Sequence, residues 1–291
     1  MTHAVDNALE TSGAGPRRRL RLSWSGWIGA VVVLFWLLMA LFGPWLAPYD
    51  QAEMVTPGSF LPAGGEFVLG SDYLGRDTLS RILWGARTTI GIAVAATLLS
   101  YAVGIPLGIA AAVAGGWTDT ILSRINDALL ALPTIMLGLI VIAALGTSIT
   151  ILIGTAALVY ASGVFRLARA LGQDIMVKDF VEAARARGEG IWWIVSREIL
   201  PNAAMPLATD FGFRTVFVIL FVSSLSFLGL GVQPPTADWG SMVRENMQGL
   251  SYGALAAVWP ALAIASLTLA INMVVDDISA RRGAGLARKM L

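Results

Sequence analysis

The chain has 291 residues, of which 56% are hydrophobic and 13% are charged, which is about half the charged share of an average soluble domain. With 20 basic and 19 acidic residues the net charge is +1, which excludes a highly charged disordered chain and argues against a nucleic-acid partner. No cysteine is present and His3 is the single histidine, which excludes disulfides and multi-histidine metal sites and argues against a Ser-His-Asp triad. The function classes that remain are transport, sensing and scaffolding in a membrane.

Six apolar segments are long enough to cross a bilayer, which takes roughly 20 mainly apolar residues. The first, 27–47, follows a basic cluster at 17–21. Its apolar core is longer than that of a signal peptide, so we expect an uncleaved membrane anchor. A polar segment, 48–87, comes next. The other apolar segments are 88–114, 127–145, 149–170, 208–230 and 255–275.

The distribution of Lys and Arg predicts the orientation, because cytoplasmic loops are enriched in these residues. With the N-terminus inside, four precede the first span, one lies in the first inner loop, six lie at 166–197 and four follow the last span. Four lie in the outer segments, and Arg214 lies near the start of the fifth span. We therefore expect an all-α polytopic membrane protein with six transmembrane helices and with both termini cytoplasmic.

This orientation assigns each part of the chain to the cytoplasm, the membrane or the extracytoplasmic side. We expect a cytoplasmic tail at 1–26, the first transmembrane helix at 27–47, an extracytoplasmic segment at 48–87, a five-helix core at 88–275 and a cytoplasmic tail at 276–291. The longest polar stretch on the inner side, 173–201, lies within the core between the fourth and fifth spans.

The cytoplasmic loop 173–201 is predicted to form two short helices around a turn. Residues 178–187 are dense in Ala, Glu and Arg, which are good helix formers, and Gly188 suits a left-handed helix C-cap. A second amphipathic segment follows, and Pro201 ends it or begins the next helix. The loop is either a docking element for a cytoplasmic partner or an interfacial helix with Trp192 and Trp193 at headgroup level.

The same loop resembles the EAA loop of ABC importer permeases. The resemblance is carried by Glu182-Ala183-Ala184, by Gly188 and by Leu200-Pro201, whereas Glu198 stands where the family pattern has isoleucine. In that family the loop forms coupling helices that sit in a groove of the ATP-hydrolysing subunit. The resemblance therefore implies a set of ATPase-coupling residues: Glu182, Ala183, Ala184, Arg185, Gly188, Leu200 and Pro201.

Further blocks at 42–50, 69–87 and 224–240 narrow the resemblance to the dipeptide/oligopeptide/nickel branch and, within it, to the second, C-type permease. The resemblance implies the type I ABC importer permease fold in the inner or plasma membrane of a prokaryote. It also implies a homologous B-type permease, two ATP-binding subunits and an extracytoplasmic solute-binding protein as partners.

This chain is not expected to hydrolyse ATP itself. A Walker A loop needs a Gly-Lys-Ser/Thr sequence, and the two lysines, Lys178 and Lys289, follow Val177 and Arg288. We therefore expect no enzyme activity and no bound metal or cofactor, with ATP and Mg²⁺ held by the partner ATPases. Movement of the docked loop would switch the surrounding helices between inward- and outward-open arrangements.

Charged residues outside the loop are further candidates. Asp210 and Arg214 are four residues apart and share a helix face near the cytoplasmic end of the fifth span, and an ion pair that locks this span to a neighbour is favoured over a place on the substrate path. Asp72, Arg76 and Asp77 in the outer segment either contact the substrate-delivering protein or stabilise a solvated loop.

Two features are expected to serve packing and membrane anchoring. Gly104 and Gly108 have the spacing that lets helices approach closely. Trp239 is predicted to lie at a membrane interface as an anchor.

The resulting hypothesis is a permease subunit that forms half of the translocation pathway for di- or oligopeptides. A nickel chelate or another small solute is the alternative substrate. An ion-gradient-driven secondary transporter is the alternative class, but such proteins usually carry intramembrane carboxylates and internal repeats, and the predicted spans hold few ionisable groups.

Overall fold

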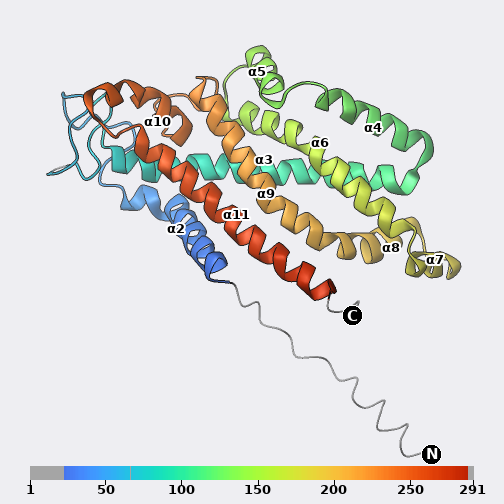
Figure 1. Ribbon diagram of the computed structural model, residues 1–291. Helices are drawn as coiled ribbons and strands as arrows, with labels where there is room; N and C mark the ends of the chain where they lie inside the picture. Colours follow the sequence, from blue (N-terminus) through green and yellow to red (C-terminus); the bar gives the residue numbers. More distant parts are fainter. Residues whose placement is uncertain (1–22, 66, 288–291) are drawn as a thin grey trace, which may run out of the picture.

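The computed structural model describes residues 23–65 and 67–287. The basic cluster at 17–21 and the final residues 288–291 lie outside this part of the chain. Within it, helices make up all the regular structure apart from two isolated β-bridges, Gly64 to Phe67 and Ser71 to Asp77. The predicted all-α architecture is confirmed (Figure 1).

Five helices in the described part are long and apolar enough to cross a membrane. Three of them follow the predicted segments closely: α2 (Trp24–Leu46), α6 (Ile149–Met176) and α11 (Val258–Ala287). The fourth, α3 (Thr78–Ala114), begins ten residues before the predicted span at 88–114. The fifth runs from Ile191 to Phe227 and includes α9 (Leu200–Phe227).

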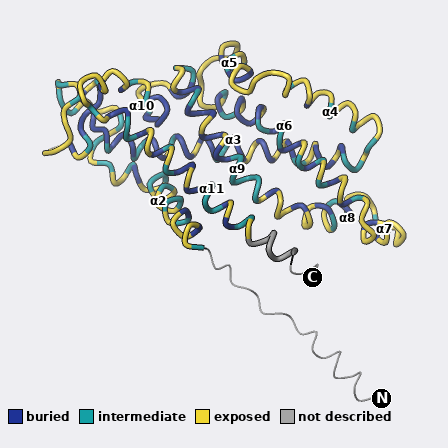
Figure 2. Tube along the Cα trace, in the orientation of Figure 1, coloured by how far each residue is buried: buried dark blue, intermediate teal, exposed yellow. Residues whose placement is uncertain are grey.

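The predicted third span, 127–145, is not a straight helix. Instead α4 (Gly116–Leu130) and α5 (Thr134–Leu145) form a pair bent by 88°, which supplies the sixth span if it is counted as one. The break falls at Pro133, which lacks a backbone N–H and disfavours helical geometry in the residue before it. Figure 2 shows α4 as the most exposed of the long helices.

The early start of α3 has a local cause. Asp77 is its N-cap, and the carboxylate accepts hydrogen bonds from the backbone N–H of Ser80 at 2.7 Å and from the Ser80 hydroxyl at 2.6 Å. An N-cap acceptor satisfies backbone donors that have no partner within the helix. Residues 78–87 of the predicted extracytoplasmic segment therefore belong to a helix.

The most extensive helix–helix interface in the described bundle joins α3 to α6. A Cβ added at Gly104 would lie 2.6 Å from the Val164 Cβ, and one added at Gly108 would lie 2.6 Å from the Phe165 carbonyl oxygen. Small residues at this spacing let two backbones approach closely. The predicted role of the two glycines in close packing is confirmed.

Replacing Gly108 by leucine is expected to lower the free energy of unfolding by about 1–3 kcal/mol, because the side chain would overlap α6. The matched control is Gly91→Leu on the same helix, where an added Cβ meets nothing within 4 Å. Thermal unfolding of the detergent-solubilised protein measures both variants. Equal unfolding temperatures for the two would contradict this prediction.

The helices define two ends of the bundle (Figure 1). The start of α2, the end of α11 and the short helix α7 (Asp179–Ala186) lie toward one end, which we call the α7 end. Asp277 of α11 accepts hydrogen bonds from the backbone N–H of Ser23 at 3.2 and 3.3 Å, which ties these two helices together there. Segments 47–65, 67–77 and 228–257, the last of which contains α10 (Trp239–Asn246), lie at the opposite end, which we call the α10 end.

Candidate functional site

The α7 end carries the segment that resembles the EAA loop. Helix α7 follows directly after α6, and it begins with two acidic residues, Asp179 and Glu182, in its first turn. Acidic side chains are favourable there because the helix dipole is positive at this terminus. Val181 and Ala184 are both fully buried, and they pack in a hydrophobic cluster with Ile194. The helix is therefore held against the bundle on one side and free on the other.

A left-handed glycine closes α7. Gly188 has φ +83°, a conformation that costs other residues free energy because of their Cβ. The backbone N–H of Glu189 donates to the Ala184 carbonyl at 3.2 Å, and that of Gly188 donates to the Arg185 carbonyl at 2.9 Å. The predicted left-handed cap is present, and it turns the chain back toward the membrane helices.

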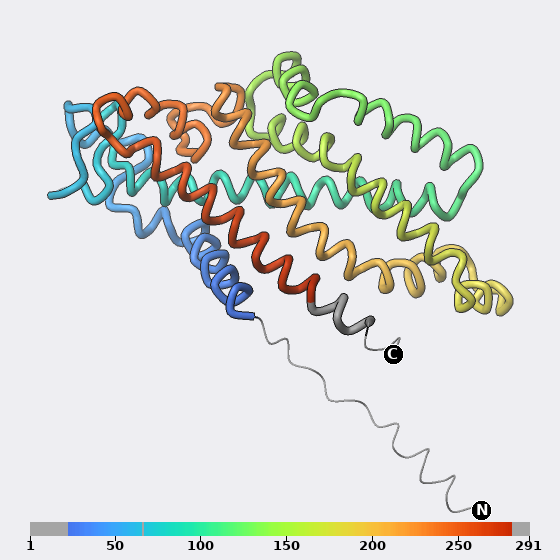
Figure 3. The backbone as a smooth tube through the Cα atoms, in the orientation of Figure 1, coloured from blue at the N-terminus to red at the C-terminus, as the bar shows by residue number. Residues whose placement is uncertain are grey.

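The second helix of the segment does not end at Pro201. Helix α8 (Ile191–Ile194) passes into a π-helical turn, η1 (Val195–Ile199), and then directly into α9. The N–H of Leu200 bonds to the Val195 carbonyl, five residues back. This wider turn makes room for the Pro201 ring, which would clash with a carbonyl in a regular helix. Figure 3 shows the backbone continuing into α9 without a break.

The predicted coupling residues divide by exposure. Glu182, Ala183, Arg185, Gly188, Leu200 and Pro201 are exposed. Ala184 is 0% exposed, so it forms no part of an outer contact face, contrary to the expectation for a coupling residue. Ala184 faces the core because it lies three residues after the buried Val181, and residues at this spacing share one face of a helix.

Exposed apolar side chains extend this surface beyond the predicted residues. Val177 is 79% exposed, Phe180 is 42% exposed and Trp192 is 85% exposed. Local sequence gives no sign that Val177 and Phe180 lie outside the core, since each stands next to an apolar residue that is partly or fully buried, Met176 and Val181. We call the exposed residues Val177, Phe180, Glu182 and Ala183 the α7 surface, whereas Trp192 lines a groove against α3.

The α10 end places Asp72 and Arg76 in a buried ion cluster. Asp72 pairs with Arg76 at 2.7 Å and with Arg81 at 2.5 Å, and Glu245 of α10 pairs with each arginine at 3.1 Å. None of the four side chains is more than 5% exposed. Nε and Nη2 of Arg81 have no hydrogen-bond partner among the described residues. The cluster joins the segment before α3 to α10.

This burial corrects the predicted contact with a substrate-delivering protein. Asp72, Arg76 and Asp77 are 1%, 2% and 3% exposed, respectively, so none is available to a partner in this structure, although much of the segment that precedes them, such as 61–65, is exposed. Asp77 caps α3 while the other two hold α10 in place. Arg81 and Glu245 escaped the sequence analysis because their partners are distant in sequence: Arg81 and Glu245 are 164 residues apart.

Asp238 and Trp239 make a second buried junction between α3 and α10. Asp238 caps α10 by accepting from the Ser241 N–H at 3.0 Å, and it also accepts from the Thr89 hydroxyl at 2.8 Å. Complete burial raises the pKa of the Asp238 carboxyl above its usual range. Trp239 is 0% exposed and donates to the Ile82 carbonyl at 3.0 Å. The predicted interface anchor is therefore a core residue.

Asp210 and Arg214 form an ion pair at 2.9 Å on α9. Tyr101 of α3 donates to Asp210 at 2.5 Å, and the Arg214 guanidinium lies directly against Gly163 of α6. The pair thus connects three helices, α3, α6 and α9.

Tyr101→Phe is expected to cost about 1.5–3 kcal/mol of stability, because it removes a hydrogen bond to a charged, partly buried acceptor. Tyr160→Phe removes a bond to the neutral Phe217 carbonyl and is expected to cost about 0.5–1.5 kcal/mol. Thermal unfolding of both variants tests whether Tyr101→Phe is the more destabilising of the two. A stability loss for Tyr101→Phe no larger than that for Tyr160→Phe would contradict the prediction.

A bundle of membrane-length helices that holds a short helix outward at one end has the architecture of the membrane subunit of a transporter. Within the described residues, no group of three or more His, Cys, Asp or Glu side chains is placed to hold a metal ion. The sequence comparisons identify the kind of transporter. Residues 104–281 match the profile of the family described as "Binding-protein-dependent transport system inner membrane component". Residues 16–62 match the "N-terminal TM domain of oligopeptide transport permease C".

Several characterised or named proteins are similar over most of their length. The di/tripeptide transport system permease protein DppC of Pseudomonas aeruginosa is 35% identical over 86% of this chain and 84% of its own length. The glutathione transport system permease protein GsiD of Escherichia coli is 36% identical over 90% of this chain and 86% of its own length. Among solved structures, the MetNI methionine ABC transporter matches with a TM-score of 0.57 at 17% identity, over 69% of this chain and 95% of that one.

The chain therefore belongs to the family of binding-protein-dependent transport system inner membrane components, and it is a permease subunit of an ABC importer. The predicted family, C-type branch and inner-membrane location are confirmed. The alternative of an ion-gradient-driven secondary transporter is wrong, because the chain belongs to the family of binding-protein-dependent transport system components and its relatives are permease proteins of such systems.

Proposed function

We propose that this permease forms half of the translocation pathway for di- or oligopeptides, and that a homologous permease supplies the other half. Support for a peptide substrate comes from relatives named for di/tripeptide and glutathione transport, the second of which carries a tripeptide. A solute-binding protein would deliver the peptide at the α10 end, which would face outward. Two partner ATPases would bind ATP and Mg²⁺ at the α7 end, which would face the cytoplasm.

The observation that supports the coupling role is the way α7 is packed against the helix bundle. Its inner face is fixed to the bundle by Val181 and Ala184, which share a buried cluster with Ile194 of α8, and α8 continues through η1 into the membrane helix α9 without a break. A displacement of α7 would therefore be transmitted to α9 rather than absorbed by a flexible loop. This is the mechanical requirement for turning ATPase closure into a rearrangement of membrane helices.

The test is uptake by a complete importer assembled in proteoliposomes from both permeases, the ATPases and the binding protein. The labelled substrates are a dipeptide, a tripeptide, glutathione and a nickel chelate. We expect ATP-dependent uptake of the peptides and none when an ATPase variant unable to hydrolyse ATP is used. Uptake of the nickel chelate alone would contradict the proposed substrate, and a complex that forms without the ATPases bound would contradict the coupling role.

A further inference from the structure

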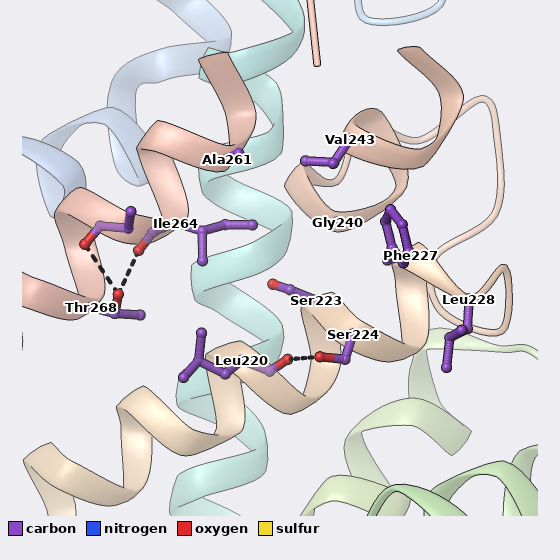
Figure 4. Close-up of a pocket in the computed structure, with 11 residues that line it drawn as sticks. Leu220, Ser223, Ser224, Phe227, Leu228, Gly240, Val243, Ala261, Ile264 and Thr268 are labelled. Atoms are coloured by element: carbon purple, nitrogen blue, oxygen red, sulfur yellow. Dashed lines mark hydrogen bonds between the residues drawn. The ribbon is translucent and has the colours of Figure 1, made fainter. Parts of the chain in front are cut away.

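A cavity of about 560 Å³ lies between α9, α10 and α11 near the α10 end (Figure 4). Its walls are mainly apolar, with Phe227 and Leu228 from the end of α9, Val243 from α10 and Ile264 from α11. Hydroxyl groups are the polar side-chain atoms of the lining, and the lining residues include no carboxylate. The cavity is therefore suited to a small molecule with apolar side chains and a few hydrogen-bonding groups.

One hydroxyl in this cavity is left without a partner. The Ser223 side chain is 93% buried, since the residue is only 7% exposed, and its Oγ makes no hydrogen bond to any described residue. By contrast, Ser224 donates to the Leu220 carbonyl at 2.7 Å and Thr268 donates to the Ile264 carbonyl at 2.9 Å. Figure 4 shows the Ser223 hydroxyl pointing away from α9 toward α11. A buried hydroxyl without a partner is costly, so this group is placed to bond a ligand.

A cation without a counter-ion stands at the rim of the cavity. Arg244 follows the lining residue Val243 on α10, and its Nη1 lies 2.8 Å from where a Cβ on Gly229 would be, beside the lining residue Leu228. Arg244 is exposed, and it forms no ion pair with a described residue. The acidic neighbours are already engaged, because Glu245 pairs with Arg76 and Arg81. An exposed guanidinium in this position favours a carboxylate, which it can bind through two hydrogen bonds.

We propose that this cavity is a binding subsite for the C-terminal half of a short peptide on the translocation path. The peptide carboxylate pairs with Arg244, a backbone amide bonds the Ser223 hydroxyl, and the apolar walls receive a side chain. Ser223 lines the cavity from within α9, whereas Arg244 lies at its rim beside Gly229, just past the last residue of α9, so one short peptide can reach both groups. The inference rests on the proposed function, because it takes a peptide as the substrate.

The first test compares a labelled tripeptide with its C-terminal amide in the reconstituted importer. The affinity of the binding protein for each peptide is measured separately, so that the comparison isolates the permease. We expect the free acid to be taken up roughly 10-fold faster than the amide, as a charge-assisted hydrogen bond predicts. Arg244→Gln should lower uptake of the acid to the level of the amide, whereas Arg87→Gln, an exposed arginine on α3, should not.

Removal of the Ser223 hydroxyl provides a second, independent test of the subsite. Ser223→Ala is expected to slow both peptides about threefold, the size of one neutral hydrogen bond. Ser279→Ala is its control, because that hydroxyl bonds only within its own helix, to the Val275 carbonyl at 2.8 Å. Arg244→Gln and Ser223→Ala variants that behave like their controls, in an importer that carries peptides, would overturn the subsite alone. A wild-type importer that carries no peptide would overturn the proposed function as well.

The absence of cysteine from the sequence allows a direct occupancy measurement. A Val243→Cys variant places a single thiol in the cavity, and Met54→Cys, at a residue 67% exposed in the segment before α3, places one outside it. We expect saturating tripeptide to protect the first thiol from a water-soluble maleimide and to leave the second unprotected. Labelling of Val243→Cys by a lipid-soluble reagent only, without protection by peptide, would show a lipid-filled cavity and overturn the proposal.

Discussion

Replacing Ala183 by tryptophan is expected to weaken binding of the ATPase subunits by about 30-fold, the effect of losing about 2 kcal/mol at a central contact. ATP-dependent uptake should fall with it. Ala183 is exposed on α7, on the side away from the buried Val181 and Ala184. A large side chain there leaves the fold intact and changes only the α7 surface.

Two variants make the result specific. Ala52→Trp introduces the same side chain at an exposed position of the α10 end, and it should leave co-purification of the ATPases unchanged. Ala184→Trp should instead destabilise the permease itself, because that residue has no exposed surface. Thermal unfolding separates this outcome from a loss of docking. Normal co-purification and normal uptake with Ala183→Trp would show that α7 is not the docking element.

Replacing Arg81 by methionine is expected to lower the free energy of unfolding by about 3–5 kcal/mol, the usual cost of removing one partner from a buried ion pair. Arg81 is 0% exposed and contacts both Asp72 and Glu245. Without it the cluster keeps two carboxylates and the single cation of Arg76, so one negative charge stays buried without compensation. Urea or thermal unfolding in detergent, with a folded-state reporter such as tryptophan fluorescence, measures the loss.

A double variant tests whether the cause is the uncompensated charge. Arg81→Met combined with Glu245→Met leaves the neutral pair of Asp72 and Arg76 at 2.7 Å, and it should recover part of the lost stability, with a coupling of about 0.5–3 kcal/mol between the sites. Arg87→Met, on an exposed side chain of the same helix, should change stability by about 0.5 kcal/mol or less. Additive losses in the double variant would show that lost packing, rather than charge, explains the effect.

The membrane helices were largely predictable because their signal is local. A run of apolar residues long enough to span the bilayer is stable in the membrane regardless of which other segments pack against it. Helices α2, α6 and α11 therefore appear near their predicted positions. The turn after α7 was predictable for the same reason, since Gly188 adopts its left-handed conformation without help from distant residues. Pro133 carried a local signal as well, because it marks the break that divides the span predicted at 127–145 into α4 and α5.

The roles of the charged residues were not predictable in this way. Asp72 and Arg76 have the composition of a solvated loop, and only their contact with Arg81 and Glu245 removes them from water. Arg76 and Glu245 are 169 residues apart in sequence, so no local pattern relates them. Ser223, whose hydroxyl has no partner among the described residues, and Arg244 at the rim are likewise brought near one cavity only by the packing of α9 against α10 and α11.

The sequence by itself determined that this protein crosses the membrane and that it lacks the Walker A motif of an ATPase, and it predicted that one polar segment docks a partner. These conclusions depend on chain length, apolar runs and short motifs, which act over a few turns of helix. The tertiary structure decided which side of α7 is free, which charges are buried and where a substrate could bind. Those properties depend on contacts between residues far apart in the chain, and burial of a side chain has no meaning until the packing around it is known.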